Sequence, residues 1–248
     1  MQFKLLGYEF SLGWISTLFT LLCIALFIKL GLWQYHKAEI KQNIENQYQA
    51  SLSKQDVMLS DYLDHPEQLQ YQKVNVLGEY APQYQILIDN QMETERAGFH
   101  VVTPFKIKGK DLYVLVNRGW LAGGVNHQDT PKFETPLGEQ TISGMLWIPT
   151  AKIFSLESTE SQVESKVWQP VWQHLDMKKY HAQAPIQVLD VIVKLAPEQA
   201  TGGFVRNWQL PPSRIMTNLS YAYQWFGFAF AALAIYLYSS ISKVKQKE

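Results

Sequence analysis

Phe10–Ile28 reads FSLGWISTLFTLLCIALFI and contains no Asp, Glu, Lys or Arg. A second uncharged stretch, Ile215–Ser242, reads IMTNLSYAYQWFGFAFAALAIYLYSSIS near the other end of the chain. At about 1.5 Å per helical residue, each stretch is long enough to cross a hydrocarbon layer of roughly 30 Å. The sequence therefore predicts two transmembrane helices that flank one large polar insert.

We place the first transmembrane helix at residues 10–32, an extracytoplasmic domain at 33–214, the second transmembrane helix at 215–242 and a basic cytoplasmic tail at 243–248. A cleaved signal peptide is the alternative for the first stretch. Signal sequences have apolar cores of about 7–15 residues before a small-residue cleavage site. Here the apolar run continues to Trp33 without such a site, which favours an uncleaved anchor.

The distribution of lysine indicates the orientation in the membrane. The tail carries three lysines and the N-terminal arm carries one, and basic residues near span ends favour the cytoplasm. Lys29, Lys37 and Lys41 flank the first span on the other side and argue against this orientation. We predict cytoplasmic N and C termini, with the insert in the periplasm and both spans in the cell inner membrane.

The insert is close to neutral and has no cysteine. Of 22 basic residues, four lie outside residues 29–214, and of 22 acidic residues, two do, which leaves 18 basic and 20 acidic residues. This balance does not indicate a nucleic-acid partner. The single cysteine, Cys23, lies in the first span, so the insert has no disulfide, no Cys-x-x-Cys-His haem attachment motif and no predicted metal site.

Apolar spacing predicts the elements of the insert. Apolar residues recur at four-residue intervals over 37–52 and predict a helix that continues from the first span and lays a narrow apolar stripe on the domain. From residue 71 the pattern alternates as in strands. The predicted strands are 74–80, 86–88, 99–107, 112–116, 140–148, 166–169 and 186–195, with a hairpin turn at 108–111, a short helix at 172–181 and loops at 123–138 and 197–212.

This pattern predicts the fold class of the whole chain. It is a membrane α+β protein in which two transmembrane helices flank a β-rich, antiparallel and barrel-like extracytoplasmic domain.

Five motifs occur in a fixed order along the chain. They are GLWQYHK at 31–37 followed by Lys41, YQKVNVLGEY at 71–80, the run from Gly98 to Phe105, VLVNRGW at 114–120 and YAYQWF at 221–226. Together with the two spans they resemble the surfeit-locus family of cytochrome c oxidase assembly factors. The resemblance covers nearly the whole chain.

The resemblance implies a function. It implies a non-enzymatic assembly factor that helps deliver haem A to the large, haem-bearing subunit of a haem–copper oxidase. Further implied partners are the machinery of haem A synthesis or transfer and membrane lipid. An alternative is a membrane-anchored scaffold that stabilises assembly intermediates without binding haem. An enzyme is the competing class, but the chain has no Gly-x-Ser-x-Gly elbow, His-Glu-x-x-His helix or phosphate loop, so we predict no catalytic residue.

Two positions depart from the family pattern. The family commonly has an arginine at the position of Lys37, and a histidine proposed as a haem contact at the position of Asn218. An asparagine does not replace imidazole as an axial ligand of iron, so direct ligation is not carried over to residue 218. His36 lies at the same membrane face and is a hypothetical substitute ligand, with an exposed interfacial histidine as the alternative.

The predicted site residues fall into two groups. The predicted haem or partner contacts are Trp33, Gln34, His36, Lys37, Asn218, Tyr221 and Trp225, and the predicted partner or structural residues are Lys41, Arg118 and Trp120. Trp33 serves either as an interfacial anchor or as an aromatic wall against a porphyrin or a partner helix. Lys37 and Lys41 are one helical turn apart and face either haem propionates or lipid headgroups.

Arg118 ends an apolar strand, where an unpaired charge is unfavourable. It therefore either pairs with an acid inside the domain, with Asp89-Asn90 as the candidate, or contacts another protein. A structural lock at the turn with Gly119 and Trp120 is the favoured interpretation.

Overall fold

The computed structural model describes residues 2–5, 8–11, 13–124, 131–149, 168–199, 202–208 and 214–243. The chain divides into two units. The helical unit comprises Met1–Asn46 and Leu210–Glu248, and the barrel unit comprises Gln47–Gln209.

The elements in chain order are β1 (Gln2–Leu5), β2 (Tyr8–Ser11), α1 (Trp14–Leu52), β3 (Val57–Met58), η1 (Leu59–Asp61), η2 (Pro66–Leu69), β4 (Lys73–Tyr80), η3 (Pro82–Tyr84), β5 (Ile86–Glu93), β6 (Arg96–Ile107), β7 (Tyr113–Ala122), β8 (Gln140–Trp147), β9 (Val171–Trp172), α3 (Met177–Gln183), β10 (Val188–Leu195), α4 (Ile215–Ser240) and β11 (Ile241–Lys243).

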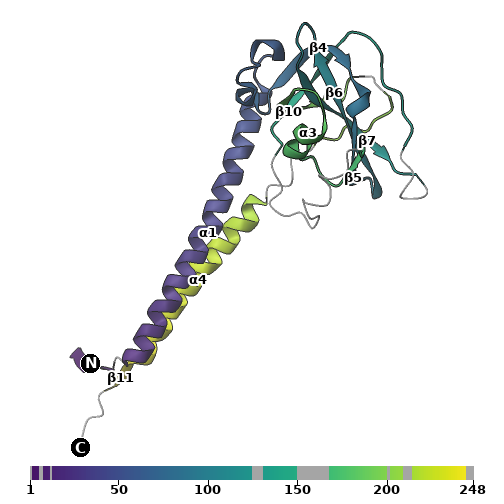
Figure 1. The fold of residues 1–248 in the computed structure, drawn as a ribbon. Helices are drawn as coiled ribbons and strands as arrows, with labels where there is room; N and C mark the ends of the chain where they lie inside the picture. Colours follow the sequence, from purple (N-terminus) through teal and green to yellow (C-terminus); the bar gives the residue numbers. More distant parts are fainter. Residues whose placement is uncertain are drawn as a thin grey trace, which may run out of the picture. The chain divides into compact units, whose positions relative to one another are not determined.

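In the helical unit, α1 and α4 run side by side (Figure 1). Their contacts give the relative direction. Thr17, near the start of α1, is 2.5 Å from the hydroxyl of Tyr236, and Lys41 bonds to Asn218 near the start of α4. A residue early in α1 thus contacts a residue late in α4, and a residue late in α1 contacts one early in α4, so the two helices are antiparallel.

Among the described residues, α1 is the one helix that is both long and apolar enough to cross a membrane. Its apolar side chains are mostly exposed, Phe19 by 67%, and exposed apolar surface on this scale requires lipid or a partner. The predicted second helix is present as α4, which has no Asp, Glu, Lys or Arg. Asn218, Gln224 and its four tyrosines lower its mean hydropathy, so a second span stays a prediction.

The far ends of both predicted spans are not helical. A three-stranded antiparallel sheet forms there, in the order β1-β2-β11. Phe10 lies in β2 and α1 begins at Trp14, while α4 ends at Ser240 because Ile241 begins β11. Residues 244–248 of the predicted tail lie outside the described residues.

The predicted helix over 37–52 is confirmed, because α1 continues without a break to Leu52. In the barrel unit, the Tyr48 ring packs edge-on against the Tyr71 ring at a centroid distance of 5.9 Å. Leu52 is 55% exposed, so only part of the predicted apolar stripe is packed.

Five strands of the barrel unit close on themselves. Their order is β4-β8-β10-β7-β6, and β6 pairs again with β4. Gly78 is required at this closure because a Cβ there would lie 1.9 Å from the carbonyl oxygen of Lys106. The predicted barrel-like domain is confirmed. The ladders among these five strands are antiparallel except that β10 runs parallel to β7, and outside the barrel β3 pairs with β4, and β9 with β5, in parallel.

Strand alternation fills the barrel. Val74 and Val76 on β4, and Val114 and Val116 on β7, are fully buried in one apolar cluster. Side chains two residues apart on a strand share a face. Arg118 continues the Val114–Val116 series and is therefore brought to the end of this core.

A second apolar cluster includes Trp172 of β9 and Tyr180 of α3. The predicted strand at 166–169 is wrong where it can be compared: Trp168 and Gln169 are not in a strand, and residues 166–167 lie outside the described residues. The predicted helix at 172–181 begins later, at Met177, because the Asp176 carboxylate caps it by accepting a hydrogen bond from the backbone N–H of Lys179.

Candidate functional site

Several predicted site residues lie on the faces that α1 and α4 turn toward each other. Residues that are buried or half-buried recur every three or four positions on both helices, as in a coiled coil. We call this set the helix seam, and it consists of Thr17, Thr20, Ile24, Phe27, Gly31, Gln34, Ala38 and Lys41 on α1, and Asn218, Ala222, Trp225, Ala229, Ala232, Tyr236 and Ser240 on α4.

A chain of two hydrogen bonds crosses the helix seam. The Lys41 ammonium donates to Oδ1 of Asn218 at 2.7 Å, and Nδ2 of Asn218 donates to Oε1 of Gln34 at 2.6 Å. An ammonium can only donate, which fixes the orientation of the Asn218 amide and hence of the next bond. Gln34 and Lys41 lie seven residues apart and share one face of α1. The chain links the two helices through polar atoms that each have a partner.

Small residues allow the helices to approach closely. A Cβ at Gly31 would lie 2.5 Å from the Phe226 ring, so this ring fits only against a glycine. Ala222 on α4 and Ala38 on α1 are both buried. Small residues at such positions are the usual means of close helix packing in membranes.

Three aromatic rings meet in the next layer: Phe27 and Trp225 of the helix seam, and Phe228, which lies beside the seam and is 52% exposed. Trp225 stacks on Phe27 with a centroid distance of 5.8 Å, and Phe228 lies 6.0 Å from Phe27 and 5.7 Å from Trp225. Trp225, predicted as a haem or partner contact, therefore presents a ring face to α1. Phe27 was not predicted, although its seven-residue spacing from Gln34 is visible in the sequence.

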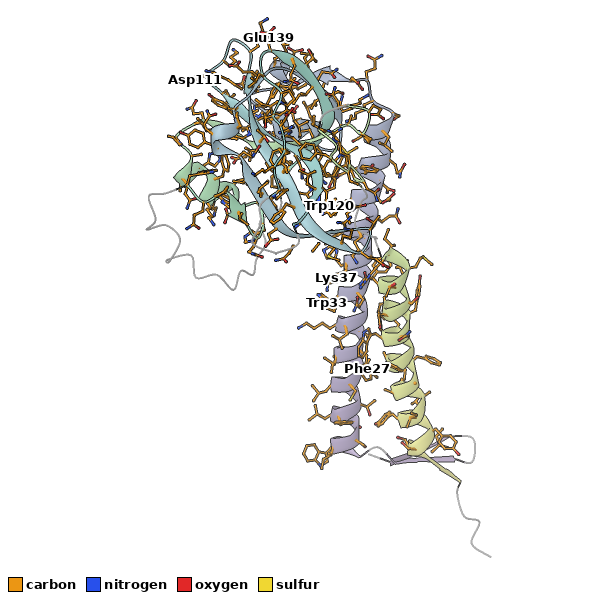
Figure 2. The ribbon with its side chains drawn as sticks, turned by 90° about the vertical axis from the view of Figure 1, so that its right-hand side faces the viewer. Phe27, Trp33, Lys37, Asp111, Trp120 and Glu139 are labelled. Atoms are coloured by element: carbon orange, nitrogen blue, oxygen red, sulfur yellow. The ribbon has the colours of Figure 1, made fainter. Side chains whose placement is uncertain are left out.

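Trp33 and Lys37 lie beside the helix seam and contact each other on α1 (Figure 2). The Lys37 ammonium is 3.7 Å from the centroid of the Trp33 ring, and Trp33 remains 51% exposed. Lys41 bonds to Asn218 instead, so the two lysines predicted as a pair have separate partners. The remaining surface at this point is an exposed indole with a cation on its face.

The structure does not bring His36 and Tyr221 into the helix seam. His36 lies two residues from Gln34, roughly 160° around the helix, and its Nδ1 is 3.3 Å from a Glu39 oxygen. Both side chains of that pair are largely exposed. Tyr221 is 49% exposed. His36 is thus not positioned to bind a group between the helices.

The helix seam does not supply an axial ligand for haem iron. Asn218 uses its oxygen for Lys41 and its nitrogen for Gln34, and an amide nitrogen has no lone pair available to a metal. His36, the hypothetical substitute, is on another face of α1. The residues therefore do not fit iron ligation, whereas the exposed ring of Trp33 and the charge of Lys37 fit the flat, carboxylate-bearing rim of a porphyrin.

Arg118 is fully buried in the barrel unit. Its guanidinium donates to Oγ1 of Thr135 at 2.8 Å and to the carbonyl of Glu134 at 2.7 Å. The proposed partners Asp89-Asn90 bond to each other instead, from the backbone N–H of Asn90 to the Asp89 carboxylate. The guanidinium is therefore held inside the barrel unit and is not presented at its surface.

Aromatic rings surround the Arg118 guanidinium. Its Cζ is 4.7 Å from the Phe204 centroid, 5.1 Å from that of Tyr80 and 5.5 Å from that of Phe133. Within the described part of the chain, Nε of Arg118 and the Tyr80 hydroxyl have no hydrogen-bond partner. Burial lowers the pKa of Arg118, and it raises the pKa of Tyr80 to about 12.

The residues around Arg118 complete a structural lock. Gly119 has a φ of +125°, which favours glycine, and its N–H donates to Oδ1 of Asn117. Trp120 is buried, and its indole N–H donates to the carbonyl of Gln91 at 2.8 Å. Trp120 also pairs with Val205 as an isolated bridge. The predicted partner or structural residues Arg118 and Trp120 thus act inside the barrel unit.

Comparison with known proteins finds relatives of this chain. A sequence profile of the SURF1 family matches residues 21–230. The SURF1-like protein of Rickettsia conorii is 26% identical over 224 residues, which cover 86% of this chain and 85% of that protein. That of Rickettsia felis is 25% identical over 239 residues, with 90% and 95% covered. That of Drosophila melanogaster is 31% identical over 146 residues, with 52% and 46% covered.

Proposed function

Because the chain belongs to the SURF1 family, which is linked to cytochrome oxidase assembly, we propose that it is an assembly factor for a haem–copper terminal oxidase. We place its action on the large, haem-bearing subunit of that oxidase. Members of the family are assembly factors rather than enzymes, and we assign the same class to this chain.

The observation that carries this proposal is the outer surface of the two helices. Apart from the helix seam, α1 and α4 present large apolar side chains outward, among them Phe19, Phe230 and Ile235. Such a surface suits lipid and the membrane helices of a larger complex. The polar chain through Asn218 holds the helices together while these outer faces stay available for docking.

The proposal includes a membrane topology. α1 is the anchor, and α4 is the second span, so that both chain ends lie on the cytoplasmic side of the inner membrane and the barrel unit lies in the periplasm. The 26 residues of α4 support this topology, because they include no Asp, Glu, Lys or Arg. Carbonate extraction and labelling of tags at both ends test it: release of the protein, or labelling of the ends from opposite sides, contradicts two spans.

Within assembly, we place the protein at the delivery or insertion of haem A. Trp33 and Lys37 are the residues proposed to contact this cargo, through a ring face and a charge that pairs with propionate. Asn218 holds the helices together and does not bind iron. The alternative is a scaffold that does not bind haem A. The two roles are compatible with the same fold and differ only in whether haem A binds to this protein.

Two measurements test the function. Deletion of the gene is expected to lower the haem A content and the amount of assembled terminal oxidase, as seen in membrane spectra and native gels. Full oxidase content after deletion contradicts the assembly role.

Titration of the purified full-length protein with haem A then separates the two assembly roles. A saturable Soret band that is weakened by Trp33→Ala and Lys37→Glu, with Lys29→Glu as the matched control, supports delivery. Copurification with the oxidase subunit without a saturable band supports the scaffold.

A further inference from the structure

A cavity in the barrel unit has no part in the function proposed above. It measures about 210 Å³ and lies on the outside of the barrel. We call it the Lys194 cavity, and the lining residues that matter here are Leu52, Tyr71, Met145, Lys194, Pro197 and Trp208. Most of the surface of its walls is apolar, and its charged lining residues are Lys54, Asp56, Lys73, Lys194 and Glu198.

Strand alternation explains the position of Lys194. Val193 and Leu195 point into the barrel core, so Lys194, between them on β10, points outward. Its ammonium is 3.5 Å from the centroid of the Trp147 ring and 5.6 Å from that of Trp208. Two indole rings therefore hold this cation at the cavity wall.

Lys194 has no acidic partner among the described residues. Lys73 and Asp56 also line the cavity, but they pair with each other at 3.3 Å. Lys54 and Glu198 are exposed at the cavity rim. The other titratable group near Lys194 is His100, which stacks on Trp208 and whose pKa burial lowers. Among the charged residues that line the cavity, Lys194 is thus the half-buried one, and the others are exposed.

Tyr71 gives a second, independent sign of a built site. Its φ is +65°, a left-handed conformation that is uncommon outside glycine, and this conformation places its ring 4.8 Å from Trp147. Backbone strain of this kind concentrates at binding sites. The left-handed conformation of Tyr71 costs free energy. We infer that the position of the Tyr71 ring is what the fold gains in return.

We propose that the Lys194 cavity binds a small organic carboxylate. The carboxylate meets the Lys194 ammonium, and the apolar part of the ligand lies against Tyr71 and Trp208. One half-buried cation with apolar walls suits a monoanion better than a phosphate, which requires several donors. The volume lies below the roughly 300–1,000 Å³ of pockets for drug-sized ligands, so the ligand is small.

Binding of an anion is coupled to the proton on Lys194. Burial lowers the pKa of Lys194 to about 8, so part of the population is neutral just above neutral pH. A bound carboxylate favours the charged ammonium and raises this pKa. Affinity is therefore highest below pH 8 and falls about tenfold per pH unit well above it.

The test uses the full-length protein in detergent and phenylacetate as the probe, with the neutral phenylacetamide as its control. Lysines are ¹³C-dimethylated and followed by NMR. Besides the α-amino group, which also titrates near pH 8, we expect one lysine resonance that titrates there and is lost in Lys194→Met. We expect phenylacetate but not phenylacetamide to raise the pKa of this lysine.

Calorimetry with unmodified protein gives the second readout. Lys194→Met is expected to weaken phenylacetate binding at least tenfold at pH 7, on the order of 1.4 kcal/mol or more. Lys179→Met, which removes another lysine from a tryptophan face, leaves it unchanged. Leu52→Trp fills the cavity from its exposed rim and abolishes binding even if Lys194→Met does not fold.

Three outcomes overturn the proposal. They are no saturable binding of phenylacetate, equal binding of phenylacetamide, and unchanged binding in both Lys194→Met and Leu52→Trp.

Discussion

The helix seam contains a half-buried polar side chain, Asn218, and the barrel core contains a fully buried one, Arg118, and the hydrogen bonds of the two are satisfied to different degrees. In the helix seam, Asn218 uses both its oxygen and its nitrogen, and Lys41 and Gln34 are its partners. In the barrel core, Arg118 bonds to neutral oxygens and rings, and its Nε has no partner in the described part of the chain. Both polar atoms of the Asn218 amide are therefore hydrogen-bonded, whereas one nitrogen of the Arg118 guanidinium is not bonded to any described residue.

The difference also shows what each polar group does. The Asn218 chain fixes how two otherwise apolar helices pair. Arg118 ties the segment with Glu134 and Thr135 to the barrel end, and Phe204 covers it from another segment. The Asn218 amide thus sets how two helices pair, and the Arg118 guanidinium closes the end of the barrel core.

The barrel is the more sensitive region, and Gly78→Val is expected to have the largest effect. The new side chain meets backbone at the point where β4 and β6 close the barrel, and backbone cannot move aside. We expect a loss of about 3 kcal/mol or more in barrel stability, measured by thermal unfolding with near-UV circular dichroism.

Gly227→Ala is the matched control in α4, where a Cβ would meet nothing within 4 Å. It is expected to be neutral or slightly stabilising. A Gly78→Val protein with an unchanged melting temperature would show that the strands do not close as described.

Arg118→Met comes next. It keeps the length of the stem but leaves the Glu134 carbonyl and the Thr135 hydroxyl without their donor, at an expected cost of about 2–4 kcal/mol to the barrel. Thermal unfolding measures it. Arg118→Lys restores the charge without the planar fork and should recover only part of the loss. Full recovery by lysine would mean that charge alone, and not the two-point bonding, holds the segment.

Asn218→Leu is expected to act on the helix seam alone, weakening the pairing of α1 and α4 by about 1–2 kcal/mol while the barrel melts as before. Crosslinking of Thr17→Cys to Tyr236→Cys by a short bifunctional thiol reagent, in a Cys23→Ser background, measures the pairing. Asn218→Gln is the control that keeps an amide. Equal crosslinking in Asn218→Leu and the parent would show that the hydrogen bonds through Asn218 do not contribute to the pairing of the two helices.

The last comparison concerns the dependence of barrel stability on pH. Because the pKa of Lys194 is about 8 in the folded protein and about 10.4 when unfolded, the unfolded chain binds more protons between these values. Stability contributed by Lys194 therefore rises as pH rises from about 8 to 10.4, and it is lost as pH falls through this window. The parent should gain stability relative to Lys194→Met between pH 7 and 10, as shown by denaturant unfolding. A constant difference would rule out the shifted pKa.

The fold could be predicted from the sequence where the pattern is regular. The structure contains the elements predicted from three such patterns: the uncharged ends, the alternation at Val74 and Val76, and the turn at Lys108–Asp111. The short strand Val171–Trp172 was misplaced, because two residues carry no period and their partner strand is distant in sequence. The parallel pairing of β10 with β7 was missed for the same reason.

The candidate site could be predicted only in part. Chemically distinct residues such as Lys41 and Arg118 were found, but not their partners. The partner of Lys41 lies 177 residues away, and Arg118 binds a backbone carbonyl, which no side-chain pattern marks. The three-and-four spacing that places Phe27 and Gln34 on one face of α1 can be read from the sequence. This spacing, rather than any single motif, predicts which residues of α1 face α4.

The place of β10 has a consequence for synthesis on the ribosome. This strand inserts between β7 and β8 and bonds to both, so a nascent chain that stops before Leu195 has no closed cylinder. The first hydrophobic helix has long since emerged by then, and the last one is still to be translated. Between those two events the half-made sheet has open edges, and this interval is when a chaperone or the translocation machinery would have to shield it.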